Sequence, residues 1–340
     1  MRLARIKAPG DESAIYHCVT RTVNGEFLID ETAKEVLRKQ LWRAASFSGV
    51  QVLTYCILTN HFHVLIRVPP KEVVPDKELI RRYRLLYPKT TAFTGQHGGG
   101  VLAQRPDSSI ENVLSAGGPD AERLRAALHK RMGDVSEFMK TLKQRFSVWF
   151  NRTHKRYGTL WSERFKSVLV EACPRALATV AAYIDLNPVR AGLVQDPKDY
   201  RYCGYGEAVG EGNERIRTGF GILMESADWR YVLREYRLVI FGKGSEAKAD
   251  GSTAGVIPWA EAVKVLNNGG HLPVATVLRC RVRYFTDGAV LGSEAFVAEA
   301  RRRYQAATGR RRRQKNITVL PGADWAGLTT LRGLRREVFG

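Results

Sequence analysis

The chain has 340 residues, of which 44% are hydrophobic and 26% are charged, a composition that excludes a disordered or fibrous protein and has room for two domains. Lys and Arg number 54 against 34 Asp and Glu, which gives a formal net charge of +20. This surplus indicates a polyanionic partner, with nucleic acid as the leading candidate, although ribosomal and membrane-surface proteins share it.

The five cysteines are scattered, and no CxxC pair occurs, which argues against a zinc ribbon or a disulfide framework. We therefore expect reduced thiols in a cytoplasmic protein. No long apolar run follows the basic N-terminus, and no stretch of about 20 apolar residues occurs, so we expect neither a signal peptide nor a membrane span.

The first elements predicted along the chain are a strand and a helix. Residues 14–23 are rich in β-branched and aromatic types, which is typical of a strand. Residues 31–48 have apolar positions at helical spacing, with Asp30 as the N-cap and Gly49 at the stop.

Two neighbouring strands are predicted next, from the apolar runs at 50–58 and 61–68, which only two residues separate. Residues 69–130 are punctuated by proline and glycine, and we interpret them as a loop-rich insertion that is partly helical near 76–87 and 120–131. A minimal ferredoxin-like fold does not need this insertion.

A long helix, a strand and a second helix are predicted after the insertion. Asp134 or Ser136 can cap the helix over 137–156, whose apolar side chains recur every three or four residues. A strand follows at 164–172, and a helix runs from 174 to about 186, where a proline ends it.

The element order β-α-β-β-α-β-α predicts an α+β fold, a ferredoxin-like split βαβ sandwich. Its antiparallel sheet would carry helices on one face and leave the other face free to meet a ligand. Beyond this unit, taken as residues 1–205, the composition changes. Helical patches at 224–241 and 258–268 and a basic tail predict a smaller, mostly helical and DNA-binding domain over 206–340.

His61 and His63 lie two residues apart on a predicted strand, so both side chains project from one face, with Phe62 on the other. Two imidazoles on one face can hold a divalent cation if a third ligand lies nearby. So short a motif also arises by chance, with one histidine at the surface and the other bonded to a core carbonyl.

Tyr183 and Asn187 lie four residues apart on the predicted helix, so their side chains share a face. Asn187 offers an amide oxygen as a hard ligand, and the phenol of Tyr183 could attack a phosphate. A phenol has a pKa of about 10 and needs a metal or a base to react at neutral pH. In the alternative, Tyr183 is a core aromatic and Asn187 a helix cap. Asp185 lies on a different face.

Three segments carry a resemblance to a known family: LTNHFHVLIRVP (58–69), GTLWSERFKSVLVE (158–171) and YIDLNPVRAGLVQDPKDYRY (183–202). In this order they resemble the REP-associated tyrosine transposases, a branch of the single-tyrosine HUH transposases. The resemblance covers roughly residues 12–205.

The resemblance implies a ferredoxin-like domain that binds single-stranded DNA, usually beside a hairpin. Tyr183 matches the nucleophile that cleaves the strand and becomes linked to its 5′ phosphate. His61 and His63 match the paired histidine ligands, and Asn187 matches the polar third ligand. Mg²⁺ or Mn²⁺ suits such a mixed imidazole and amide site.

Basic and aromatic side chains near these motifs are candidates for DNA contact. Arg164 and Lys166 could line a phosphate track, Arg145 lies on the preceding helix, and Trp161 could stack on a base. The alternative is a solvated basic helix face and a core tryptophan. The tail with Arg310 to Arg313 could act as a non-specific arm.

These observations favour a metal-dependent single-stranded DNA transposase or strand transferase. A nicking enzyme of the replication-initiator type, from the same superfamily, and a catalytically silent nucleic-acid-binding regulator stay open. The expected partner is single-stranded or hairpin DNA and not a membrane, and the sequence leaves open whether the chain forms a homodimer.

Overall fold

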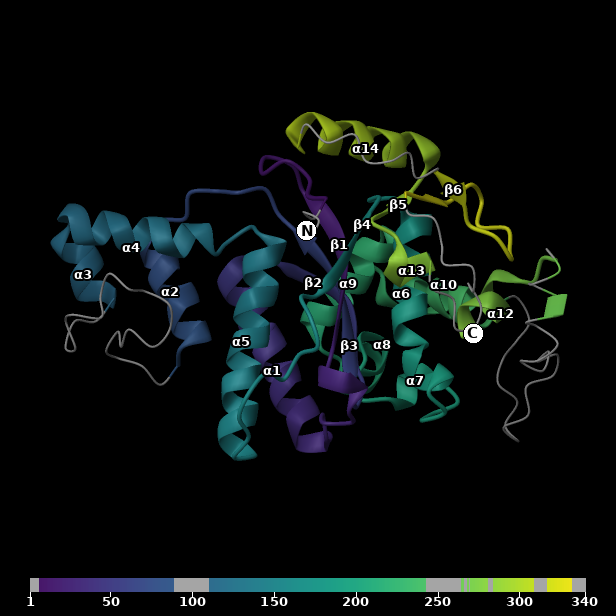
Figure 1. Ribbon diagram of the computed structural model, residues 1–340, viewed down its shortest axis with the longest axis horizontal. Coiled ribbons are helices and arrows are strands. Elements are labelled where there is room, and N and C mark those ends of the chain that lie inside the picture. The colour runs from purple at the N-terminus through teal and green to yellow at the C-terminus, as the bar shows by residue number, and fades with distance from the viewer. Residues whose placement is uncertain are drawn as a thin grey trace.

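The computed structural model describes residues 6–88, 110–242, 264, 265, 268, 270–280, 284–308 and 317–331. Its sheet has seven strands in the order β2-β3-β1-β4-β5-β7-β6, and helices surround it (Figure 1). The strands are β1 (Ala14–Arg21), β2 (Gln51–Ile57), β3 (His61–Val68), β4 (Lys166–Val170), β5 (Val290–Gly292), β6 (Thr318–Val319) and β7 (Thr329–Thr330).

The first four strands confirm the predicted α+β, ferredoxin-like unit. They pair antiparallel in the order β2-β3-β1-β4, with α1 (Glu31–Ser48) between β1 and β2 and α5 (Val135–Thr153) between β3 and β4. Asp30 accepts a hydrogen bond from the Ala33 amide at 2.8 Å, and Gly49 ends α1 in the left-handed conformation, as its lack of a Cβ permits.

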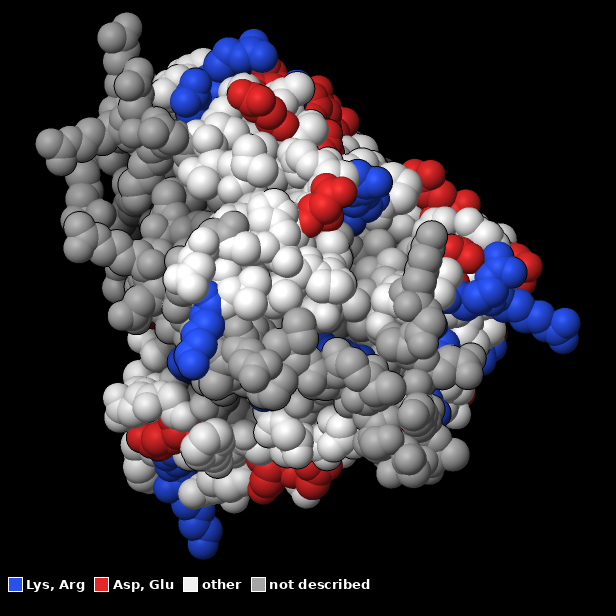
Figure 2. Space-filling model, turned by 90° about the vertical axis from the view of Figure 1, so that its right-hand side faces the viewer, with Lys and Arg blue, Asp and Glu red and all other residues white. Residues whose placement is uncertain are grey.

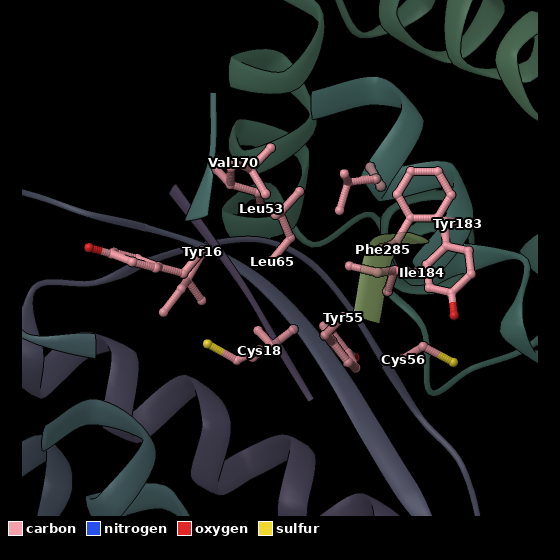
Figure 3. Close-up of a cluster of buried hydrophobic side chains, with 14 of the residues drawn as sticks. Tyr16, Cys18, Leu53, Tyr55, Cys56, Leu65, Val170, Tyr183, Ile184 and Phe285 are labelled. Carbon is pink, nitrogen blue, oxygen red and sulfur yellow. The ribbon is translucent and has the colours of Figure 1, made fainter. Parts of the chain in front are cut away.

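One face of this sheet packs against α1 and α5. Alternate strand residues point to it, among them Tyr16, Cys18 and Phe62, all of which are buried. Phe62 contacts Trp161, whose ring contacts Phe146 of α5. Figure 3 shows Tyr16 and Cys18 on this side of the strands and Tyr183 with Phe285 on the opposite side.

The opposite face is not free, which corrects the expectation that only one face carries helices. It packs against α6 (Pro174–Asp185) and α9 (Glu214–Met224), both of which contact β2, and against α13 (Tyr284–Asp287), which contacts β1 and β4. A strand that is covered on both faces has a continuous apolar run and not an alternation of apolar and polar residues. β2 and β3 have such runs, so their sequences did not reveal which face would be covered by helices.

The C-terminal part of the chain extends the same sheet. β5 runs parallel to β4, and β7 and β6 add to it antiparallel, so β4 is not an edge strand. The described helices here are α9, α10 (Trp229–Phe241), α12 (Val274–Arg279), α13 and α14 (Glu294–Thr308). Their buried residues join those of the ferredoxin-like unit in one hydrophobic cluster.

The helix predicted in the patch at 224–241 is α10, which begins at Trp229, because α9 ends at Met224 with Glu225 in a left-handed conformation. The patch at 258–268 and Arg310 to Arg313 of the tail lie largely or wholly outside the described residues. The division into domains at 205/206 stays a prediction.

The insertion forms a small helical layer with its own apolar cluster, centred on Leu79, Leu86 and Leu124. It comprises α2 (Asp76–Leu86), α3 (Ile110–Ala116) and α4 (Gly118–Lys130), so the helices predicted near 76–87 and 120–131 are confirmed. Figure 1 shows this layer beside α1 and α5, away from α6 and α7.

Four short helical turns complete the described elements and connect the larger ones. They are η1 (Val23–Gly25), α7 (Asn187–Arg190), η3 (Pro197–Asp199) and α8 (Gly204–Gly206), which continues into η4 (Glu207–Glu211). Of the helices that the structure describes, none combines the length and the apolar character needed to cross a lipid bilayer.

Candidate active site

His61 and His63 open β3 directly after the turn, and both point to the sheet face on which α6 lies. Their ring centroids are 5.1 Å apart. His63 is 3% exposed and pairs across to Val19, whereas His61 is half-buried and pairs across to Arg21 at the end of β1. The predicted geometry of two imidazoles on one strand face is therefore present.

Hydrogen bonds orient the His61 ring. Asn60 donates from Nδ2 to the Gly25 carbonyl at 3.0 Å, which turns its Oδ1 toward His61. His61 Nδ1 lies 2.6 Å from that oxygen, and an amide oxygen only accepts, so Nδ1 carries the proton. In the neutral ring the lone pair is then on Nε2, the form of imidazole that binds a cation.

His63 is held in a second hydrogen bond, from its Nδ1 to Nε2 of His17 at 2.9 Å. Burial, followed by the adjacent imidazole of His17, lowers the pKa of His63 well below its usual range. The ring is therefore neutral at physiological pH, which is the state that a metal ligand requires.

Tyr183 lies on α6, which begins at Pro174 and packs its apolar side on β2 and β3. Its ring centroid is 6.0 Å from that of His63 and meets it edge-on. Phe285 of α13 covers another side at 4.8 Å, and Tyr183 is only 7% exposed. The structure thus brings the predicted nucleophile beside His63. Figure 3 shows Phe285, from the C-terminal part of the chain, against Tyr183.

Asn187 caps the helix and still presents its oxygen. Its Nδ2 donates to the carbonyls of Tyr183 at 3.1 Å and Ile184 at 3.0 Å, which is the cap role left open by the sequence. Both bonds use the nitrogen, so Oδ1 is the atom that can serve a cation. The cap and ligand roles are compatible because they use different atoms of one amide.

The residue Arg190 belongs to this site, although the sequence reasoning did not assign it. Its guanidinium lies 4.4 Å from the Tyr183 ring centroid. It donates to the Tyr183 carbonyl at 2.6 Å and to the Leu278 carbonyl at 2.7 Å. It thus places a positive charge against the phenol and ties the tyrosine helix to α12. In the sequence, the only sign of this role was the position of Arg190 just after the predicted end of the tyrosine helix.

Asp185 anchors the same helix from its other side, as its separate helical position predicted. Its carboxyl group accepts from Thr54 at 2.8 Å and from Tyr236 at 2.6 Å. Complete burial raises the pKa of Asp185 to about 7. The group therefore serves the packing of α6 on β2.

The four candidate DNA contacts separate into two groups. Lys166 is exposed at the start of β4 and pairs with Val19, which pairs with His63, so the lysine shares the histidine face. Arg164 is exposed two residues earlier. Lys166 therefore lies where a DNA strand approaching His63 could meet it.

Trp161 and Arg145 lie on the α5 side of the sheet, away from the face of the histidines, and their role as DNA contacts stays a prediction. Trp161 is 7% exposed and packs between Phe62 and Phe146. Arg145 stacks 4.8 Å above the ring of Tyr87. The core alternative holds for the tryptophan because its flat, apolar ring fills the gap between sheet and helix.

The described residues contain no cluster of three or more His, Cys, Asp or Glu side chains that could hold a metal ion. A cation on His61 and His63 therefore needs a ligand of another type, and the amide oxygen of Asn187 is the candidate on the neighbouring helix. The donor set of two neutral imidazoles and an amide suits a borderline or hard divalent ion.

Comparison with known proteins gives a match to one family. The family described as "Transposase IS200 like" matches residues 12–84, which span β1 to α2 and include both histidines. Tyr183 and Asn187 lie outside this range. None of the curated proteins matches the chain.

A solved structure titled "Structure of the REP associates tyrosine transposase bound to a REP hairpin" is similar to this chain, with 13% identity and a TM-score of 0.38. It covers 62% of this chain and 87% of its own. A likeness of this size carries no conclusion about individual residues. The family match confirms, over residues 12–84, the resemblance to these transposases that was inferred from the sequence.

Proposed function

We propose that this chain is a transposase that cleaves single-stranded DNA through a covalent link to Tyr183, at sites flanked by hairpins. The observation that carries the proposal is the meeting of two elements remote in sequence. The His61 and His63 strand, inside the matched family domain, lies against a helix that places a tyrosine ring 6.0 Å from His63.

The cleavage step needs no nucleotide. The Tyr183 oxygen forms a bond to the phosphorus while the bond from phosphorus to O3′ breaks, which leaves a 5′-phosphotyrosine and a 3′ hydroxyl. The phenol loses its proton, and the departing oxygen gains one. A later 3′ hydroxyl can reverse the step and join the strand, because the phosphotyrosine is still a diester.

The side chains of the site have separate tasks in this step. Arg190 holds a positive charge against the phenol ring and fixes the main chain of Tyr183. His61, His63 and Asn187 would hold Mg²⁺ or Mn²⁺, which when bound supplies Lewis-acid polarisation of the scissile phosphate. Lys166 and Arg164 would bind the flanking phosphates by charge.

The net charge of the chain supports a polyanionic substrate, although the described charges do not all gather on one face. On the side shown in Figure 2, Lys and Arg are interspersed with Asp and Glu around a broad uncharged area. The exposed Arg21, Arg164 and Lys166 at the ends of β1 and β4 are the described candidates for a basic surface that meets DNA.

One observation favours a second candidate, a regulator that binds DNA without cutting it. Tyr183 is 7% exposed and Phe285 lies against its ring, so little of this side chain is open to a DNA strand. The nicking enzyme of the replication-initiator type, left open by the sequence, has the same chemistry and differs in the DNA that it recognises.

The test is a denaturing gel of the full chain incubated with labelled single-stranded hairpin oligonucleotides and Mn²⁺. The proposal predicts a covalent adduct in the wild type, its loss in Tyr183→Phe with binding retained, and its loss in His61→Ala. Tyr157→Phe, at a tyrosine that is 94% exposed, is the matched control. Binding without an adduct across a broad set of hairpins would establish the regulator instead.

A further inference from the structure

His17 lies on β1 beside the histidine pair and has no role in the proposed cleavage. It is fully buried, on the same sheet face as His63, and diagonal to it across the β1–β3 pairing. Its Nε2 lies 2.9 Å from His63 Nδ1, and its Nδ1 lies 2.7 Å from the carbonyl oxygen of Phe285. A chain of two hydrogen bonds thus runs from α13 through His17 to His63.

The ring geometry supports a hydrogen bond between the two imidazoles rather than a face-to-face stack. Their centroids are 5.1 Å apart with 21° between the ring planes. Two imidazoles that face each other edge to edge, with nitrogens 2.9 Å apart, have about this separation between their centroids. Each nitrogen lone pair or N–H lies in the plane of its ring, so the contact has hydrogen-bond direction.

The Phe285 carbonyl sets the direction of both bonds. A carbonyl oxygen only accepts, so His17 Nδ1 must carry a proton. A neutral imidazole that carries its proton on Nδ1 has its lone pair on Nε2. That nitrogen can only accept, so the proton in the second bond belongs to His63 Nδ1.

We propose that His17 is a positioning residue that fixes His63 in the tautomer with the proton on Nδ1 and so directs the lone pair of Nε2 at the cation. The proposal rests on the metal role given to His63 in the proposed function. A neutral imidazole can carry its proton on either nitrogen, and the bond made by one nitrogen decides what the other offers. Without an acceptor at Nδ1, the proton could occupy the ligating nitrogen.

Asn60 does the same for His61 by a different route, through an amide oxygen at 2.6 Å. Both ligand rings would then keep their proton on Nδ1, because a neighbouring residue accepts a hydrogen bond from that nitrogen. The difference lies in the source of the constraint. For His61 it is the adjacent residue, and for His63 it is a relay that ends on a carbonyl 268 positions from His17.

Two variants of the full chain separate positioning from packing. His17→Gln can place an amide oxygen near the original Nε2, whereas His17→Phe has a ring of similar size and no acceptor. Both variants lose the hydrogen bond from Nδ1 to the Phe285 carbonyl. A difference between them therefore reports only on the acceptor that faces His63. Thermal melts of both variants establish that each is folded.

The first readout is the tautomer of His63 in metal-free protein, from long-range ¹H–¹⁵N spectra of histidine-labelled chain, with His63→Gln used to assign the signal. The proposal predicts a protonated Nδ1 in the wild type and in His17→Gln, and a shift toward a protonated Nε2 in His17→Phe. A wild-type ring with its proton on Nε2 would overturn it.

The second readout is Mn²⁺ affinity by titration. We expect a loss of about 10- to 100-fold in His17→Phe, the usual effect of removing the partner of a metal-bound histidine, and a loss smaller than about threefold in His17→Gln. Equal affinity in all three proteins would refute the positioning role. Failure of the proposed metal site looks different, since His61→Ala would then leave Mn²⁺ binding unchanged while the tautomer spectra kept their predicted pattern.

Discussion

Asp185→Asn is expected to remove a specific pH dependence of stability. The Asp185 carboxyl group is fully buried between α6 and the sheet, where Thr54 and Tyr236 donate to it and the Tyr205 amide lies at 3.3 Å. Asparagine keeps these contacts, because its Oδ1 can accept from Thr54 and Tyr205 and its Nδ2 can donate to the Tyr236 oxygen. The substitution therefore deletes the ionisation and little else.

Burial raises the pKa of Asp185 from 3.8 to about 7, so folding favours the neutral acid. The stabilisation is fully present below the unfolded pKa and is lost as the pH rises through the folded pKa. The difference between the two pKa values corresponds to about 4 kcal/mol at most, of which roughly 2–3 kcal/mol is lost between about pH 5 and about pH 8.

The assay is urea unfolding of the wild type and Asp185→Asn across this pH range, with Asp228→Asn, at the exposed N-cap of α10, as a control. The stability of Asp185→Asn relative to the wild type should rise by roughly 2–3 kcal/mol between about pH 5 and about pH 8, and the two proteins should converge only below the unfolded pKa of the acid. A constant difference between the two proteins at all pH values would refute the reasoning.

Three further predictions concern the described packing and charge. Glu207→Gln removes the charge that faces Arg38 at 2.7 Å in the core and should cost about 3 kcal/mol by urea unfolding; a cost below about 1 kcal/mol would contradict a buried ion pair. Trp161→Ala should cost about 3–5 kcal/mol with little effect on the DNA affinity of the folded protein, whereas weakened binding at unchanged stability would restore a stacking role. Lys166→Gln should lower the salt dependence of single-stranded DNA binding by about 0.7 in the log–log slope, measured by anisotropy, while Lys39→Gln on α1 should not; equal slopes in both variants would exclude a phosphate contact at Lys166.

The ferredoxin-like unit could be predicted because its signals are local. A cap at Asp30, a stop at Gly49 and two apolar runs separated by a turn define α1, β2 and β3 almost to the residue. The face shared by His61 and His63 followed from strand geometry alone. The pairing of β1 with both β3 and β4 followed from the element order.

The rest depends on contacts that leave no local pattern. β5 and β7 are three and two residues long, too short for any period, so the extension of the sheet could not be predicted. The cover of Phe285 over Tyr183 and its bond to His17 join segments far apart in the chain. For Trp161 and Arg145, composition favoured neither a core nor a DNA role, and only packing decides between them.

The central claim is that Tyr183 is the residue that attacks DNA beside the His61 and His63 pair. It is tested most directly by mass spectrometry of the protein after reaction with a single-stranded hairpin oligonucleotide and Mn²⁺, followed by protease and nuclease digestion. The account predicts a nucleotide phosphate on the peptide that contains Tyr183 and on no other tyrosine peptide. A covalent adduct on a different residue would contradict it.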